Sequence, residues 1–93
     1  MANLFITGGT GFIGRKLISS LLKSSDVEII FLLVRDTNKA SIALEKQIES
    51  ADESGKKIIL LQGDVEKENF GVSGEDIKKL KSVSEVYHLA SII

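Results

Sequence analysis

The sequence predicts an α/β fold with a parallel sheet and the element order β-α-β-α-β-α-β. Short apolar runs alternate with amphipathic segments along the chain. The run at residues 27–34 is almost continuously apolar, which is typical of a strand buried on both faces of a parallel sheet. A glycine-rich segment at residues 7–14 follows the first apolar run and precedes a helical pattern. Strands that alternate with helices form parallel sheets joined by right-handed crossovers.

The first two elements are a strand at Leu4–Ile6 and an amphipathic helix that ends near Ser24. Apolar residues recur at helical spacing in this helix and are expected to face the sheet: Ile13, Leu17, Ile18, Leu21 and Leu22. The second strand is predicted at Val27–Val34. A single helix is then predicted over residues 39–53, and its buried face is expected to carry Leu44, Ile48 and Ala51.

The second half of the chain is predicted to contain two strands and a short helix. Residues 57–62 form the third strand, and Val83–Leu89 form the fourth. Between them, the Ser73–Asp76 stretch resembles a capping box, with Asp in place of the usual Glu, that starts a helix ending near Lys81. No linker or repeat interrupts the chain, so residues 1–93 are expected to form one domain.

Composition excludes several classes of function. The 93 residues carry a net charge of -1 and no basic stripe, which argues against a nucleic-acid partner. The chain contains no cysteine, so disulfides, thiolate metal sites and cysteine nucleophiles are excluded, and no metal site is predicted. The longest apolar run, Ile29–Val34, is far shorter than the roughly 20 residues of a membrane span, and the N-terminus does not resemble a signal peptide. We therefore expect a cytoplasmic protein with no membrane partner.

The glycine-rich segment reads Thr7-Gly8-Gly9-Thr10-Gly11-Phe12-Ile13-Gly14. Between a strand and a helix, such glycines permit a tight turn, a close approach of backbone N–H groups to a pyrophosphate, and close helix–strand packing. Two registers fit: Gly9-x-Gly11-x-x-Gly14, and the longer Gly8-x-x-Gly11-x-x-Gly14, which the preceding Thr7 favours. All eight residues are predicted to bind a dinucleotide cofactor in a Rossmann-type fold with strand order 3-2-1-4. The alternative is a turn that binds nothing.

The residues after the second strand bear on which dinucleotide is bound. An acidic residue there would bond the ribose 2′-OH of NAD, whereas an arginine would accommodate the 2′-phosphate of NADP. Arg35 follows the strand directly, and guanidinium–phosphate contacts are strong and bidentate. The sequence thus favours NADP. NAD is the alternative, with Asp36 reading the ribose, and both residues could also be simple turn residues.

The glycine loop resembles that of the extended short-chain dehydrogenases, which include the NAD-dependent epimerases and dehydratases. Four further segments narrow the resemblance to the N-terminal part of the male-sterility type, that is, fatty acyl-CoA reductases and thioester reductase domains: Leu32-Leu33-Val34-Arg35, Gly63-Asp64-Val65, Phe70-Gly71-Val72-Ser73 and Val86-Tyr87-His88-Leu89-Ala90. The resemblance implies an oxidoreductase that reduces an acyl thioester or aldehyde with NADPH.

The resemblance also implies roles for particular positions. Asp64 would contact the adenine amino group with Val65 beside the ring, and Arg35 would meet the 2′-phosphate. Leu89 and Ala90 would line the path to the nicotinamide-side ribose, where Ser91 replaces a second alanine that is usual in the family. His88 and Tyr87 are interpreted as packing residues of the fourth strand.

The catalytic pair of the superfamily, Tyr-x-x-x-Lys, is absent from these residues. The only tyrosine is Tyr87, and Ser91 stands four positions later, so no catalytic residue is predicted. We expect a Rossmann half-domain truncated after the fourth strand, which binds the cofactor without turnover and associates with itself through that strand's edge. Two alternatives are an epimerase or dehydratase fragment and a non-catalytic module for NADP sensing or dimerisation.

Overall fold

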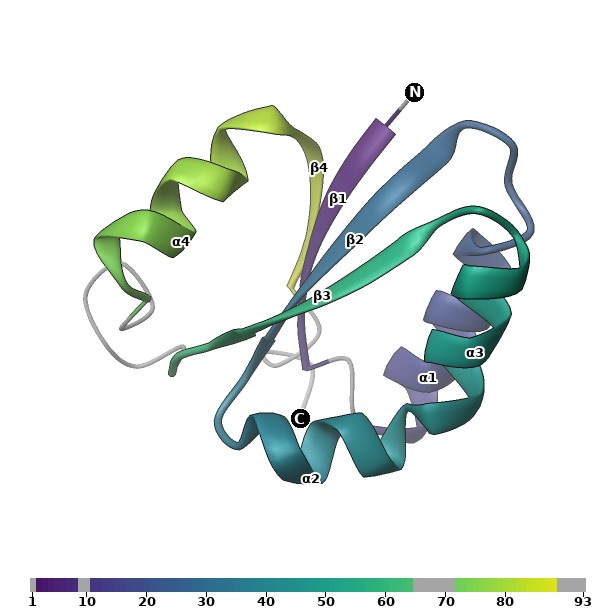
Figure 1. Ribbon diagram of the computed structural model, residues 1–93, viewed down its shortest axis with the longest axis horizontal. Coiled ribbons are helices and arrows are strands. Elements are labelled where there is room, and N and C mark those ends of the chain that lie inside the picture. Colours follow the sequence, from purple (N-terminus) through teal and green to yellow (C-terminus); the bar gives the residue numbers. More distant parts are fainter. Residues whose placement is uncertain (1, 9–10, 65–71, 89–93) are drawn as a thin grey trace.

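The computed structural model describes residues 2–8, 11–64 and 72–88. The helices and strands follow one another in the predicted order (Figure 1). They are β1 (Ala2–Thr7), α1 (Phe12–Leu21), β2 (Val27–Val34), α2 (Thr37–Ala43), α3 (Glu45–Glu53), β3 (Lys57–Gln62), α4 (Gly74–Lys79), a 3₁₀ turn (Leu80–Ser82) and β4 (Val83–His88). No helix within the described ranges is long and apolar enough to cross a membrane.

The four strands form one parallel sheet in the order β3-β2-β1-β4, which confirms the predicted topology. The chain moves outward from β1 to β3 and then crosses back to place β4 on the other side of β1. The connections from β1 and from β3 therefore leave the sheet in opposite directions. In open α/β sheets, the crevice at such a switch point is where ligands bind, outside the carboxyl ends of the strands.

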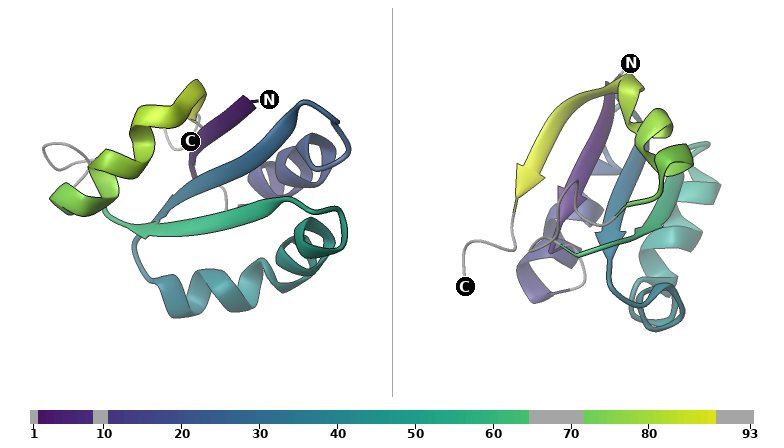
Figure 2. Two further views of the ribbon diagram at one scale, coloured as in Figure 1. Left: turned by 45° about the horizontal axis from the view of Figure 1, so that its top comes forward. Right: turned by 90° about the vertical axis from the view of Figure 1, so that its left-hand side faces the viewer.

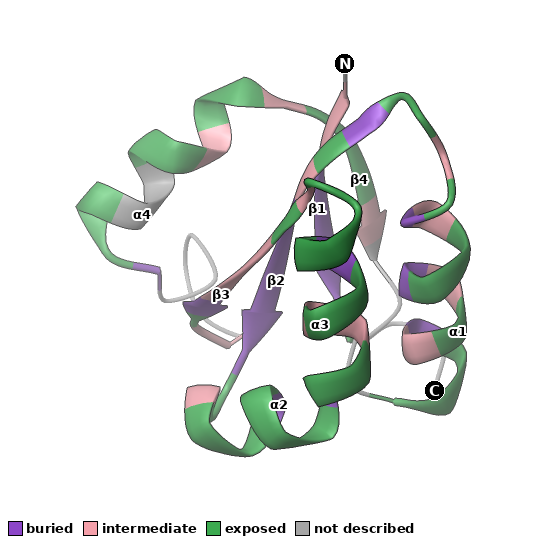
Figure 3. Cartoon of the chain, turned by 45° about the vertical axis from the view of Figure 1, so that its right-hand side comes forward, coloured by how far each residue is buried: buried purple, intermediate pink, exposed green. Residues whose placement is uncertain are grey.

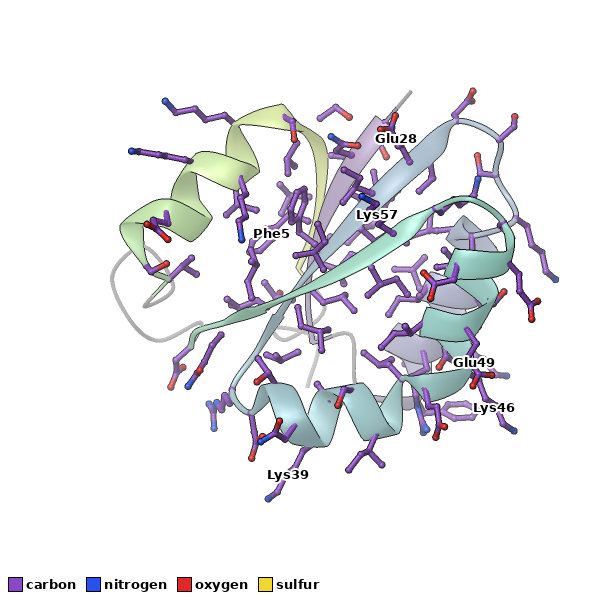
Figure 4. The ribbon with its side chains drawn as sticks, viewed as in Figure 1. Phe5, Glu28, Lys39, Lys46, Glu49 and Lys57 are labelled. Atoms are coloured by element: carbon purple, nitrogen blue, oxygen red, sulfur yellow. The ribbon has the colours of Figure 1, made fainter. Side chains whose placement is uncertain are left out.

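Two apolar cores flank the sheet, because successive side chains of a strand point to opposite faces. On one face, Leu4, Ile6, Ile30 and Leu32 pack with α1, α2 and α3. On the other face, Phe5 and its neighbours pack beneath the segment that contains α4 (Figure 4). Figure 2 shows α4 on the side of the sheet opposite to α1 and α3. The predicted burial of β2 on both faces is confirmed, and Figure 3 shows burial concentrated on β1 and β2.

The prediction of one helix over residues 39–53 is wrong, because two helices meet at Leu44. The backbone of Leu44 leaves helical geometry at φ −105° and ψ 14°. Its side chain is fully buried, so α2 and α3 can each approach the sheet at their own angle around this apolar corner. Leu44 and Ala51 are buried and Ile48 is half-buried, as predicted. The first strand also begins two residues earlier than predicted, at Ala2.

The prediction that Ile13 faces the sheet is also wrong, since 63% of the residue is exposed. The buried residues of α1 are Gly14 and Ile18, and its buried C-cap Leu22 continues the same four-residue spacing. Each helical residue is rotated by about 100° from the one before it, so Ile13 lies to the side of this row. Gly14, which the glycine pattern assigns to close helix–strand packing, is buried.

Candidate functional site

A cavity of about 480 Å³ opens at the carboxyl edge of the sheet. Gly8 follows β1, Arg35 and Asp36 follow β2, and Gly63 and Asp64 follow β3, so the ends of three neighbouring strands supply its polar walls. The apolar part of the lining comes from the end of β2 and from α2: Leu33, Val34, Ala40 and Ala43. Gly8, Arg35 and Asp64, which are predicted cofactor-binding residues, are therefore brought together around one cavity.

The glycine loop joins β1 to α1 as the sequence predicts. Gly8 has a φ of 75°, in the left-handed region that favours glycine. Gly11 is the N-cap of α1, and its Cα lies close enough to Gly8 that a Cβ built there would be 3.9 Å from the Gly8 carbonyl oxygen. Gly14 is buried. Of these three glycines, which belong to the longer register, Gly8 is the one whose backbone conformation favours glycine.

The N-terminus of α1 retains its capacity to bind an anion. Among the residues that the structure describes, no side chain caps the N-terminus of α1, where Gly11 is the N-cap, and the first turn of this ten-residue helix carries no acidic residue. The first N–H groups of a helix lack intrahelical partners and point toward an anion placed there. Thr7, directly before the loop, is fully buried, whereas Phe12 is exposed like Ile13.

Arg35 and Asp64 both line the cavity and form an ion pair, with 3.7 Å between Nη2 and Oδ1. The pairing of β2 with β3 explains this proximity. The Gly63 N–H donates to the Val34 carbonyl oxygen at 2.9 Å, so the contact between the two chain segments continues past the last paired residues. The residues that follow, Arg35 and Asp64, therefore lie side by side. The Arg35 side chain is 72% exposed and that of Asp64 is 25% exposed.

Asp36, the alternative residue for ribose recognition, caps α2. Its Oδ1 accepts hydrogen bonds from the backbone N–H groups of Asn38 at 3.0 Å and Lys39 at 3.1 Å. Asp is among the preferred N-cap residues, so its position just before a polar helix start is the sequence signal for this role. The sequence suggested Asp36 as a ribose-binding or turn residue and did not reveal that α2 lines the cavity. Lys39 also borders the cavity, and its side chain extends away from the sheet (Figure 4).

Tyr87 lies on β4 with the properties of a strand residue. It packs against the core on the α1 side of the sheet, and its hydroxyl donates to Glu85 Oε2 at 3.3 Å. The negative charge of Glu85 is the main cause that raises the pKa of Tyr87, with burial and the hydrogen bond adding to it. This environment favours the protonated phenol.

Several predicted site residues lie outside the described residues, and so does the side chain of His88. These site residues are Gly9, Thr10, Val65, Leu89, Ala90 and Ser91. Of the predicted site residues, the cavity that the structure describes is lined by Gly8, Arg35 and Asp64, whereas Gly11, Phe12, Ile13 and Gly14 do not line it.

Comparison with known families identifies the kind of domain. Residues 6–93 match the family described as male sterility protein. The chain is 36% identical over 95 residues to an aldehyde reductase of Aspergillus flavus, covering 95% of this chain and 9% of that protein. It is 28% identical over 106 residues to fatty acyl-CoA reductase 2 of Homo sapiens, covering 98% of this chain and 20% of that protein. The chain therefore spans only a minor part of these relatives.

A solved structure shares the fold. The reductase domain of PhqB from Penicillium fellutanum superposes with a TM-score of 0.75 at 27% sequence identity, and the match covers 94% of this chain and 26% of that one. The α/β sheet with order 3-2-1-4 is therefore the arrangement found in a reductase domain.

Proposed function

This chain belongs to the male sterility protein family of NAD(P)-binding reductase domains, and we propose that its cavity binds NADP(H) in preference to NAD(H). The observation that carries the proposal is the position of Arg35 at the end of β2, on the wall of the cavity and with a guanidinium that is 72% exposed. An exposed guanidinium at this edge can take a 2′-phosphate in two parallel hydrogen bonds.

The role of Asp36 supports the same preference. NAD recognition requires a carboxylate free to accept from the ribose hydroxyls. The Asp36 carboxylate oxygen Oδ1 already accepts from two backbone N–H groups of α2. Turning Asp36 toward a ribose would remove those hydrogen bonds and leave the start of α2 uncapped, so NADP is the better fit.

The remaining contacts follow from the strand ends. The uncapped N–H groups at the start of α1 and the turn at Gly8 would hold the pyrophosphate. Asp64, with its side chain 25% exposed in the cavity wall, would accept from the adenine amino group, and Val65 would lie beside the ring. Leu89, Ala90 and Ser91 would line the path toward the nicotinamide-side ribose.

We propose that the activity which this cofactor-binding domain serves is the reduction of an acyl thioester or an aldehyde, in line with the names of the relatives. When bound, the reduced nicotinamide supplies a hydride to a carbonyl carbon. The residues of this chain bind and orient the dinucleotide, whereas the Tyr-x-x-x-Lys pair that handles the proton is not among the 93 residues. This chain should therefore bind cofactor without turning over substrate.

The edge of β4 offers a route to self-association. Within the described strands, β4 pairs only with β1, and Val86 on it is 63% exposed. An unpaired edge with exposed apolar residues favours strand pairing between copies. Sedimentation analysis of the chain should show concentration-dependent dimers, and replacing Val86 with Lys should disrupt them.

The cofactor proposal is tested by calorimetric titration of the chain with NADPH and NADH. We expect tighter binding of NADPH, and a loss of this preference in Arg35→Ala while NADH binding changes little. Tighter binding of NADH by the unmodified chain would contradict the NADP assignment, and binding of neither would contradict the cofactor site as a whole.

A further inference from the structure

The Arg35–Asp64 ion pair sits where a 2′-phosphate and an adenine would meet. One guanidinium nitrogen lies 3.7 Å from one carboxylate oxygen, which is longer than the 2.7–2.9 Å typical of a charge-assisted hydrogen bond. The hydrogen bond from the Gly63 N–H to the Val34 carbonyl oxygen joins the two chain segments directly before these residues. Asp64 thus lies beside the guanidinium that would bind the phosphate.

A carboxylate in this position can affect the arginine in two opposite ways. It can hold the guanidinium in a productive orientation, which requires a close, two-point contact between buried groups. Alternatively, it can compete with a phosphate for the same positive charge. The closest approach of the pair is 3.7 Å between Nη2 and Oδ1, and the Arg35 side chain is 72% exposed, so the carboxylate does not hold the guanidinium tightly. Competition is the effect that this geometry supports.

The competition acts on one class of ligand only. A 2′-phosphate brings up to two negative charges to Arg35 and close to Asp64, so it meets both a guanidinium that is already partly neutralised and a like charge. A neutral 2′-OH meets neither obstacle. The carboxylate therefore reduces the affinity for a phosphorylated ribose relative to an unphosphorylated one.

We propose that Asp64 is a specificity-determining residue that limits the preference of this cavity for a 2′-phosphate by competing for Arg35. This inference rests on the proposed function, because it assumes that Arg35 receives the phosphate. It adds to the proposed adenine contact of Asp64, which is made equally with either ribose. The Asp64 carboxylate thus keeps the difference in affinity between NADP(H) and NAD(H) smaller than Arg35 alone would make it.

The test compares two probes that differ only in the 2′ group, adenosine 2′,5′-bisphosphate and 5′-AMP, by calorimetry on the 93-residue chain. The measured quantity is the dissociation constant of 5′-AMP divided by that of the bisphosphate, so a larger ratio means a stronger preference for the bisphosphate. Asp64→Asn should raise the preference for the bisphosphate about threefold, the scale of a solvent-exposed ion pair. Because asparagine keeps a side-chain oxygen that can accept from adenine, any change in the adenine contact affects both probes and cancels in the ratio.

Two control backgrounds separate the mechanism from a general charge effect. Glu49→Gln removes one negative charge on α3, away from the cavity (Figure 4), and should leave the ratio unchanged. In Arg35→Ala, the preference for the bisphosphate should fall toward one, and adding Asp64→Asn should raise it by less than in the unmodified chain, because only the direct repulsion between the carboxylate and the phosphate is then removed. Circular dichroism of each variant checks that the fold is retained.

The outcomes are distinct from those that test the proposed function. If the unmodified chain prefers the bisphosphate but Asp64→Asn lowers the ratio or leaves it unchanged, competition is refuted and the NADP proposal stands. An equal rise in the Arg35→Ala background would also refute it, because the effect would not pass through Arg35. If the unmodified chain binds neither probe, the cofactor proposal fails and this inference fails with it.

Discussion

The carboxylate of Asp36 accepts a hydrogen bond from the backbone N–H of Lys39 at 3.1 Å, and this contact ties the residue after β2 to the first turn of α2. The same oxygen accepts from Asn38. The cap therefore sets where α2 begins, and with it the wall of the cavity that Ala40 and Ala43 supply.

Replacing Asp36 with Ala should destabilise the protein by about 1 kcal/mol, the usual effect of losing an N-cap side chain. Chemical denaturation measures the change. Asp36→Asn keeps an accepting oxygen and should retain most of the stability. If Asp36→Ala instead leaves stability unchanged and selectively weakens NADH binding, then Asp36 reads the ribose and its role as a cap is secondary.

Gly8 and Gly55 form a matched pair for testing the glycine loop. Both have positive φ, 75° and 74°, but only Gly8 borders the cavity. Alanine at either position should destabilise the fold by about 1–2 kcal/mol, because L-residues are strained in the left-handed region. Gly8→Ala should also weaken NADPH binding, whereas Gly55→Ala should not. Equal binding by both variants would show that the turn at Gly8 does not hold the cofactor.

The burial of α1 predicts a contrast between Ile18 and Ile42. Ile18 is fully buried, so Ile18→Ala should lower the free energy of unfolding by about 2–5 kcal/mol through lost burial and a cavity. Ile42 is 75% exposed on α2, and Ile42→Ala should change the free energy of unfolding by less than about 0.5 kcal/mol. Denaturant titration measures both. Similar effects would mean that α1 does not pack on the sheet through Ile18.

The single tyrosine allows a direct titration. Glu85 raises the pKa of Tyr87 above its ordinary value of 10.0, so the folded chain keeps the phenolic proton to higher pH than the unfolded chain does. The stability linked to this group is therefore fully present below the unfolded pKa. It is lost as pH rises from the unfolded pKa through the higher folded pKa. Ultraviolet absorbance should report a pKa above 10.0 for Tyr87, and a lower one in Glu85→Gln. An unchanged titration in that variant would exclude Glu85 as the main cause.

The sequence by itself determined the features that depend on local pattern. Alternating apolar runs and amphipathic segments specify the order of strands and helices, since burial selects a period of two or of 3.6 residues. The two-sided burial of β2 follows from the same pattern, and the strand order 3-2-1-4 follows from the Rossmann-type fold that the glycine loop indicates. The glycines at positions 8, 11 and 14 similarly place a loop with special backbone geometry between β1 and α1.

Only the tertiary structure decided the features that depend on distant neighbours. The break at Leu44 arises because two short helices pack around a buried corner, which periodicity over residues 39–53 does not reveal. The exposure of Ile13 depends on which row of α1 meets the sheet. The pairing of Arg35 with Asp64, 29 positions apart in sequence, exists because β2 and β3 lie side by side in register. Both residues are recognisable in the sequence, but their interaction is created by the sheet.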